Sequence, residues 1–412
     1  MEKDIAMPEA PMTKTEAGQL PLIDHYFEPT HDEFSRQRLV SALRKFVLTD
    51  MRGQMKSAYD TLETPAFKAR HGHAPRDGRE ADKAMEQNDV AKFYSSLRYN
   101  AQEMVWASVQ EPIERVLPEM IAVAKRAATE NPAGGSLTLD PSLEVPRYVS
   151  AFDVHLIPGC FHTEHTKDDV AQGAVTAFGG GVFAGGLNWR KDSKGRNGGV
   201  GETVANYLKS KYPDFKPECI LDMGTSSGKN LFPYADAYPD AEIHGIDVAA
   251  PLLRWGHAQA QAFGLPIHFS QKNAVHTNFA DRSFDLIVSS FFFHEVPVKV
   301  TRECLAECRR LLRPGGFMVH MELPPQKDLD PFMNFFWDWD ALNNNEPAYT
   351  AFRSQNPTKL CVEAGFAKDN CFEITIPNRA TFGDDKFARF IKGEIPSPGH
   401  GSGGWYNFGA RA

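Results

Sequence analysis

The chain has 412 residues, too many for one ordinary core, and its 42% apolar and 24% charged residues are the balance of a globular protein. Its net charge of −8 argues against a general nucleic-acid or anionic-membrane binder, because such proteins carry a basic excess. No apolar run is long enough for a membrane-spanning helix or a signal peptide, and six cysteines without a C-x-x-C pair indicate reduced thiols. We therefore predict a cytoplasmic protein with neither a nucleic-acid nor a membrane partner.

The first part of the chain is predicted to be a polar arm, residues 1–30, and a mainly helical domain, residues 31–197. Apolar residues recur at helical spacing from Asp32 to about Tyr59 and again from Asp89, and Pro112 is expected to open a third helix. We expect this domain to cover a binding site in the second half and to offer a homodimer interface.

Two stretches of this half are predicted to be irregular. Residues 65–80 have the basic, Pro- and Gly-containing composition of a mobile loop. Glycine is dense between Ala177 and Gly201, which indicates a flexible loop or an uneven surface, and we place the domain boundary near Gly198.

Histidines gather between Val154 and His165. His155, His162 and His165 are metal-ligand types, and Cys160 lies among them, but their spacing matches no structural zinc pattern. We predict no metal, and we assign His155 and His162 to the wall of a small-molecule pocket.

Residues 198–395 alternate short apolar runs with amphipathic stretches, which predicts strands and helices in turn. This alternation indicates an α/β fold, a Rossmann-like doubly wound and mostly parallel sheet covered on both faces. Right-handed crossovers place the carboxyl ends of its strands at one edge, where ligands bind. The glycine-rich residues 396–412 are expected to form a flexible C-terminal tail.

A glycine turn follows the first of these strands. Asp222, Gly224 and Gly228 form a D-x-G-x-x-x-G pattern, and Asp247 ends the next strand, 19 residues after Gly228. An acid at this place can accept both hydroxyls of a ribose, although it could equally cap the following helix. The pair of features fits either a dinucleotide or an adenosylmethionine fold.

The order of the following segments resembles the class I S-adenosylmethionine-dependent methyltransferase family. Asn273-Ala274 stands where the family has an acid and a small residue, residues 284–290 resemble its fourth strand, and Leu311 to Gly316 resemble its next turn. The resemblance implies S-adenosyl-L-methionine as the cofactor and a site built from Asp222, Gly224, Thr225, Ser226, Gly228, Asp247, Val248, Asn273, Ala274, Ser289 and Ser290.

His294 and Glu295 directly follow the fourth strand, and they are similar to the catalytic His-Asp pair of phenolic O-methyltransferases. A His-Glu here also occurs in C-methyltransferases, and His294 could simply pack on the cofactor. We predict His294 as the base, supported by Glu295, with Glu322 reaching the acceptor pocket. The aromatic residues Tyr99, Phe335 and Trp337 are candidate pocket walls or, alternatively, interdomain core, and Asn343 to Asn345 are expected to form a surface turn.

The predicted function is O-methylation of a small molecule or a peptide carboxylate. The alternatives are C-methylation of a small molecule, a cofactor-binding scaffold without activity, and a nicotinamide-dependent dehydrogenase.

Overall fold

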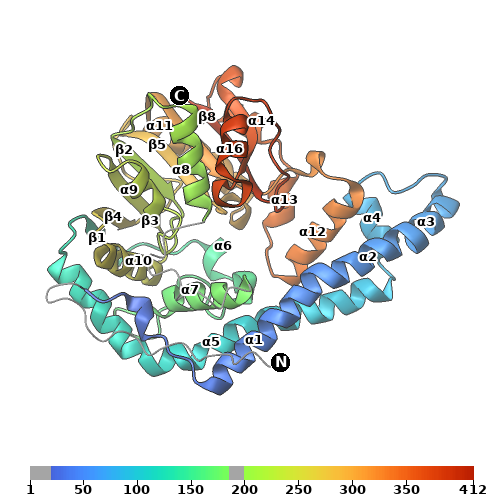
Figure 1. The fold of residues 1–412 in the computed structure, drawn as a ribbon, viewed down its shortest axis with the longest axis horizontal. Coiled ribbons are helices and arrows are strands. Elements are labelled where there is room, and N and C mark those ends of the chain that lie inside the picture. The colour runs from blue at the N-terminus through green and yellow to red at the C-terminus, as the bar shows by residue number, and fades with distance from the viewer. Residues whose placement is uncertain (1–19, 185–198) are drawn as a thin grey trace.

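The computed structural model describes residues 20–184 and 199–412, and its centre is one eight-stranded sheet (Figure 1). The strand order is β1-β4-β3-β2-β5-β6-β8-β7, and β8 alone is antiparallel to its neighbours. The predicted mostly parallel α/β sheet is therefore confirmed. The strands are β1 (Ser136–Thr138), β2 (Cys219–Met223), β3 (Glu242–Asp247), β4 (Ile267–Gln271), β5 (Phe284–Ser290), β6 (Leu312–Met321), β7 (Cys371–Pro377) and β8 (Gly404–Arg411).

The two ends of this sheet differ from the predicted domain limits. Strand β1, from the predicted helical domain, pairs with β4 at one edge. The predicted flexible tail is wrong for residues 404–411, because β8 lies between β6 and β7. Tyr406, Phe408 and Ala410 alternate into the core, and pairing on both sides satisfies the strand's backbone groups.

Helices cover both faces of the sheet (Figure 1). One face packs on α8 (Val200–Lys211), α9 (Phe232–Ala237), α10 (Ala250–Phe263) and α16 (Asp384–Ile391). The other packs on α11 (Val298–Leu311), α13 (Tyr349–Arg353) and α14 (Pro357–Glu363). Short helices lie in the connections: α6 (Arg147–Ser150), α15 (Arg379–Phe382), η1 (Ile23–Tyr26), η4 (Val154–Leu156), η5 (Phe293–Glu295), η6 (Gln326–Asp328) and η7 (Lys368–Asn370).

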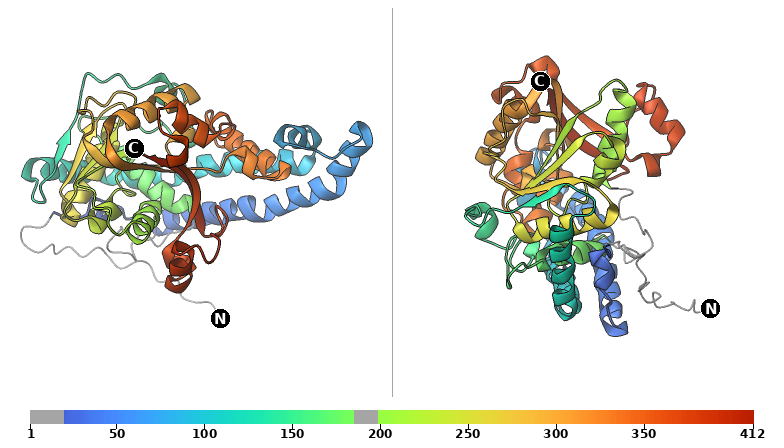
Figure 2. Two further views of the ribbon diagram at one scale, coloured as in Figure 1. Left: turned by 90° about the horizontal axis from the view of Figure 1, so that it is seen from above. Right: turned by 90° about the vertical axis from the view of Figure 1, so that its left-hand side faces the viewer.

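The remaining helices form a long arm that projects from the sheet (Figure 2). A helical run joins α1 (His31–Phe46), α2 (Arg52–Ala58) and α3 (Thr64–His71) through the π-helical segments η2 (Val47–Met51) and η3 (Tyr59–Glu63). Helices α4 (Gly78–Met85), α5 (Asp89–Glu130) and α12 (Pro331–Asn343) pack along it. The predicted mobile loop over 65–80 is thus largely helical, because Phe67, Ala81 and Met85 are buried.

Helix α5 continues through Pro112, where the sequence predicts a helix boundary, and through Pro118. A proline removes one intrahelical hydrogen bond, at a cost of about 3 kcal/mol or more. Burial of Val109, Ile113 and Met120 around the prolines offsets that cost, since each large side chain contributes about 1.5–3 kcal/mol.

Helix α7 (Ala171–Phe183) lies between α5 and α10 and joins the helical layer to the sheet domain. The second half of α7 falls in the glycine-dense stretch, so the prediction of an irregular segment is wrong for residues 177–183. The predicted domain boundary near Gly198 lies outside the described residues. Of the N-terminal polar segment predicted over residues 1–30, residues 1–19 also lie outside the described residues. Ile23 and Phe27 of the same segment are buried against α5 and α7. Within the described ranges no helix is long and apolar enough to cross a membrane.

Candidate functional site

A cavity of about 280 Å³ opens at the carboxyl ends of β2, β3, β4 and β5. Its polar floor includes seven of the eleven residues that the sequence assigns to the cofactor: Gly224, Ser226, Asp247, Val248, Asn273, Ala274 and Ser290. Its walls are mainly aromatic and aliphatic: Tyr148, Val149, Val154, Phe161, Phe291, Phe292 and Val296. The edge that the sheet topology predicts for a ligand is therefore a real cavity.

The turn after β2 is shaped by two glycines with left-handed backbone. Gly224 has φ +69°, and a Cβ there would lie 2.4 Å from the ring of Phe292. Gly228 has φ +77°, and a Cβ there would lie 2.9 Å from the ring of Phe269. A side chain at Gly224 would therefore both strain the turn and close the cavity.

Asp247 fixes this turn and also faces the cavity. Its Oδ2 accepts the Ser226 N–H at 2.9 Å, and its Oδ1 accepts the Ala249 N–H at 3.0 Å. The sequence leaves open whether Asp247 caps the following helix or binds a ligand. Because its carboxyl group both accepts backbone N–H groups and lines the cavity, the two roles are compatible. Burial raises its pKa, and these backbone donors oppose the rise.

The other four predicted cofactor residues lie behind the cavity wall. Asp222 is buried beneath the turn, and burial raises its pKa to about 7. Thr225 is buried beside β3, where its N–H donates to the Ile246 carbonyl. Gly228 packs on Phe269, and the Ser289 hydroxyl lies 2.9 Å from Nδ1 of His320.

A chain of alternating acids and imidazoles closes the cavity beyond β5. Nδ1 of His294 lies 2.6 Å from Oε2 of Glu322, and Nε2 of His294 lies 3.5 Å from Oε1 of Glu295. Nε2 of His155 lies 2.8 Å from the same Glu295 oxygen. Glu295 lines the cavity, whereas His294 is 4% exposed and Glu322 is fully buried. The structure thus brings together four residues that the sequence selects separately.

The charges in this chain stabilise one another. Burial opposes the charged form of each group, but Glu322 and Glu295 outweigh it and raise the pKa of His294 well above its usual range. Glu295 and Glu346 likewise raise the pKa of His155. His155 and His294 in turn lower the pKa of Glu295. Glu295 therefore lies between two imidazoles whose pKa values it raises.

His155 is held in an unusual backbone conformation by helix α5. Its φ is +55°, and the neighbouring Leu156 also has a positive φ. Its carbonyl accepts hydrogen bonds from Nε2 of Gln102 at 3.0 Å and from Nε1 of Trp106 at 2.7 Å. Strain that persists only because its surroundings fix it is typical of functional loops.

Four predicted pocket residues lie away from the cavity. His162 is half-buried in the loop after η4, and Tyr99 is exposed on α5. Phe335 packs inside the arm, and Trp337 contacts His400. Phe335 and Trp337 thus follow the alternative interpretation of these aromatic residues as core, whereas Tyr99 lies on the surface.

Sequence reasoning missed the residues that reach His155 from the far side. The Asn344 amide lies 2.7 Å from Nδ1 of His155, and a Glu346 oxygen lies 3.5 Å from it. The predicted surface turn at Asn343 to Asn345 is therefore wrong for Asn344, which is 2% exposed. His155, Glu295 and Glu346 place ligand atoms within 4.8 Å of one another, and their mutual ion pairing accounts for that closeness.

Residues 220–316 match a family model described as a methyltransferase domain. The chain is 34% identical over 109 residues, 26% of its length and 49% of the relative's, to a demethylmenaquinone methyltransferase from Thermus thermophilus. It is 33% identical over 107 residues, 25% of its length and 41% of the relative's, to a ubiquinone/menaquinone biosynthesis C-methyltransferase from Dinoroseobacter shibae. The chain spans less than half the length of these curated relatives.

A solved structure of phosphoethanolamine N-methyltransferase 2 from Haemonchus contortus, in complex with S-adenosylhomocysteine, is 16% identical with a TM-score of 0.35. The alignment covers 52% of this chain and 53% of that one. The matched methyltransferase domain and the curated relatives support the predicted methyltransferase family over residues 220–316, with S-adenosylmethionine as its cofactor.

Proposed function

We propose that this chain, a member of the class I S-adenosylmethionine-dependent methyltransferases, methylates a small aromatic molecule through a hydroxyl group held by Glu295. The observation that supports this most directly is the Glu295 carboxylate at the aromatic end of the cofactor cavity. A cytoplasmic location and a homodimer stay predictions from the sequence.

The cavity suits the cofactor on chemical grounds. Asp247 offers carboxylate oxygens for ribose hydroxyls, Asn273 offers an amide beside the adenine position, and the glycine at 224 leaves room above the turn. When bound, S-adenosylmethionine supplies a methyl group on a sulfonium centre with an excellent leaving group. The protein's own tasks are therefore alignment of the acceptor, exclusion of water and removal of a proton.

Glu295 is our candidate for the proton acceptor, in place of His294. Both ring nitrogens of His294 face carboxylates, so neither nitrogen is open to an acceptor hydroxyl, and these carboxylates also raise the pKa of the ring. A Glu295 oxygen accepts the hydrogen bond of the acceptor hydroxyl. Its lowered pKa makes it a weak base toward the free hydroxyl, but the hydroxyl proton becomes strongly acidic as the oxygen–methyl bond forms and then passes to this carboxylate. His294 and His155 are positioning residues that orient this carboxylate and balance its charge.

The same charge argues against a peptide carboxylate as the acceptor. An ionised Glu295 would repel a second carboxylate in a cavity walled by Tyr148, Phe161 and Phe291. A hydroxyl on a flat apolar ring satisfies both the carboxylate and these aromatic walls.

C-methylation is the second candidate, because the curated relatives include C-methyltransferases. It would use the same residues, since loss of the hydroxyl proton to Glu295 activates the neighbouring ring carbon. After methyl transfer that carbon loses its own proton to solvent, which restores the aromatic ring. Carbon-13 in the donor methyl separates the two outcomes, because O-methyl and C-methyl products give well-separated NMR signals.

The test combines binding and turnover. Calorimetry should detect S-adenosylmethionine binding by the full chain, at least tenfold weaker in Asp247→Ala and unchanged in the exposed control Asp240→Ala. A panel of hydroxylated aromatic acceptors should then yield S-adenosylhomocysteine. No cofactor binding by the wild type would overturn the proposal, and turnover only with carboxylate acceptors would overturn the role given to Glu295.

A further inference from the structure

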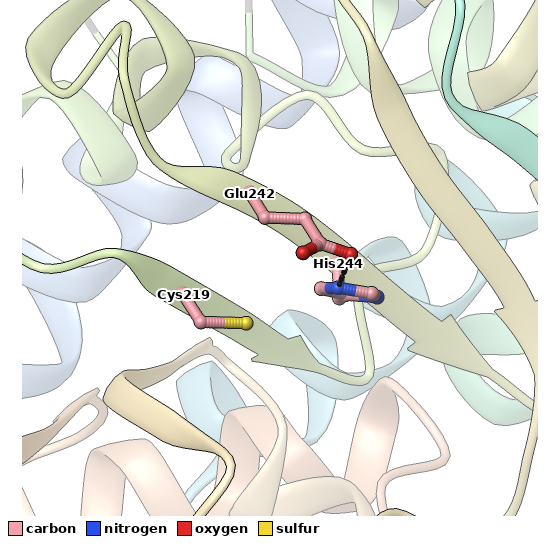
Figure 3. Close-up of side chains that lie close together, drawn as sticks. All are labelled: Cys219, Glu242 and His244. Carbon is pink, nitrogen blue, oxygen red and sulfur yellow. Dashed lines mark hydrogen bonds and ion pairs between the residues drawn. The ribbon is translucent and has the colours of Figure 1, made fainter.

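Four potential metal ligands lie at the opposite end of the sheet from the cofactor cavity. Cys219 begins β2, Glu242 begins β3, His244 follows in β3, and His268 lies in β4. Cys219 pairs with Glu242 and His244 with His268, so strand alternation places all four side chains on the α11 face. Figure 3 shows the Cys219 sulfur pointing toward Glu242 and His244. The mechanism above uses none of them.

The distances suit one ion. Ligand atoms of Cys219, Glu242 and His244 lie within 4.8 Å of one another. Oε1 of Glu242 lies 2.9 Å from Nε2 of His244 and 3.8 Å from Nε2 of His268. Bonds of about 2.0–2.3 Å to a tetrahedral zinc ion place ligand atoms roughly 3.3–3.8 Å apart. His268 lies outside that three-residue cluster, and its Nε2 approaches the cluster through Glu242.

Neighbouring groups orient both imidazoles. The Ser136 hydroxyl lies 3.0 Å from Nδ1 of His268, which leaves Nε2 facing Glu242. The His244 ring stacks on His268 with centroids 5.0 Å apart and meets the edge of Phe284 at 5.5 Å. Partners of this kind, which fix the ring that a ligand nitrogen belongs to, are characteristic of metal sites.

The surroundings also favour a cation and leave it a way in. The Cys219 N–H donates to Asp285 Oδ2, and Arg313 pairs with both Asp285 and Glu218. These two carboxyl groups thus share one guanidinium, whereas Glu242 pairs with the two imidazoles. The Glu242 side chain is 57% exposed, so an ion can reach it from solvent.

We propose that Cys219, Glu242, His244 and His268 bind a zinc ion that ties β2, β3 and β4 together. One thiolate, two imidazoles and one carboxylate are the donor types that zinc takes in four-coordinate sites. The Cys219 thiol gives up its proton to solvent as the sulfur–zinc bond forms. The site lies at the amino ends of the strands, so its role is structural and separate from methyl transfer.

Cobalt(II) is the probe, because its thiolate bond gives a charge-transfer band and tetrahedral coordination gives intense visible bands. The reduced full-length protein should show both bands at one equivalent, and zinc should abolish them. Cys219→Ser should lose the charge-transfer band, and His268→Gln should weaken zinc binding at least tenfold in competition with a chromophoric chelator. Cys371→Ser, at a half-exposed cysteine of β7, is the matched control and should bind like the wild type.

The melting temperature gives a second measurement, since a ligand that binds only the folded state stabilises it. Zinc should raise it in the wild type and in Cys371→Ser but not in Cys219→Ser. Cobalt spectra without a thiolate band would overturn the proposal, because they indicate binding elsewhere, for example at His155, Glu295 and Glu346. Unchanged zinc affinity in His268→Gln would also overturn the four-ligand site, even where Cys219→Ser folds poorly.

Discussion

At the scale of single residues, the chain of Glu322, His294, Glu295 and His155 decides which side chain can work on an acceptor. Glu322 accepts the Phe293 N–H at 2.6 Å in addition to facing His294, so it fixes the turn after β5. The buried pair of Glu322 and His294 thereby holds Glu295 at the cavity. Burial of each charged group alone costs folding free energy, so the network lowers stability while it fixes the orientation of the Glu295 carboxylate.

Glu295→Gln tests the assignment of the proton acceptor. The amide keeps the size of the side chain but cannot take up a proton, so turnover should fall by about 10²-fold or more, the range of general-base catalysis. S-adenosylmethionine affinity should stay within about threefold, since Asp247 and the glycine turn are untouched. Glu303→Gln, on the exposed face of α11, is the control. Wild-type turnover in Glu295→Gln would contradict the assignment.

His155 should titrate above its usual value of about 6.5, because Glu295 and Glu346 raise its pKa. A group with a raised folded-state pKa contributes stability that is complete below its unfolded value and is lost as the pH rises through the folded value. The difference in unfolding free energy between wild type and His155→Gln should therefore shrink as the pH rises from 6 to 9. Urea denaturation measures that difference.

Histidine NMR gives an independent measurement of the same pair. The His155 midpoint should move downward in Glu295→Gln, because the variant removes the negative charge 2.8 Å from Nε2. A midpoint below 6.5 in the wild type would show that burial outweighs the carboxylates.

At the scale of elements, local signals predicted the strands and the glycine turn, but not the ends of elements. Gly224 and Gly228 lie in the turn after β2, and Asp247 ends β3, the next strand, so the spacing of these three residues along the sequence identifies the site. The helix boundary predicted at Pro112 is wrong because burial of α5 in the tertiary structure outweighs the helix-breaking effect of one proline. The prediction of a flexible tail over residues 404–411 failed because the turn before β8 is rich in glycine, whereas the strand itself is buried along almost all of its length.

Helix α7 supplies a prediction about close packing. A Cβ at Gly173 would lie 2.4 Å from Trp255 of α10, whereas a Cβ at Gly180 of the same helix would meet nothing within 4 Å. Gly173→Ala should therefore destabilise the fold by about 1–3 kcal/mol through overpacking. Gly180→Ala should stabilise it by up to about 1 kcal/mol through helix propensity. Urea denaturation checks both, and equal effects would show that α7 does not depend on this contact.

At the scale of the whole molecule, the arm is connected to the active cavity by a buried polar network. Arg44 of α1 and Arg98 of α5 both donate to the Gln102 side-chain oxygen, and Gln102 donates to the His155 carbonyl. Arg98 also pairs with Asp340 of α12, which follows β6 in the chain. Arg98 and Gln102 lie one helical turn apart on α5, but no spacing in the sequence relates them to Arg44, His155 or Asp340, because those contacts form only when α1, η4 and α12 pack on α5. That is why the sequence predicts a cofactor site but not the partners of His155.

Substitution of Arg98 and Asp340 therefore tests whether the packing of the arm controls the position of His155 in the site. Arg98 is 2% exposed, and its Nε lies 2.5 Å from Oδ1 of Asp340, which also accepts the Tyr94 hydroxyl at 2.5 Å. Asp340→Leu leaves a buried guanidinium without its partner, and Arg98→Met leaves the carboxylate without its cation. Each single change should destabilise the fold by about 3–5 kcal/mol.

The double variant Arg98→Met/Asp340→Leu removes both charges at once. Its loss of stability should therefore be smaller than the sum for the single variants by at least about 1 kcal/mol, and a double-mutant cycle in urea measures this difference.

Turnover of the double variant tests positioning separately from stability. Without Arg98, Gln102 loses a donor that orients it toward the His155 carbonyl. The double variant should therefore fold and bind S-adenosylmethionine but turn over more slowly than the wild type. Additive stability costs would show that the pair does not couple α5 to α12. Wild-type turnover in the folded double variant would show that the arm does not set the position of His155.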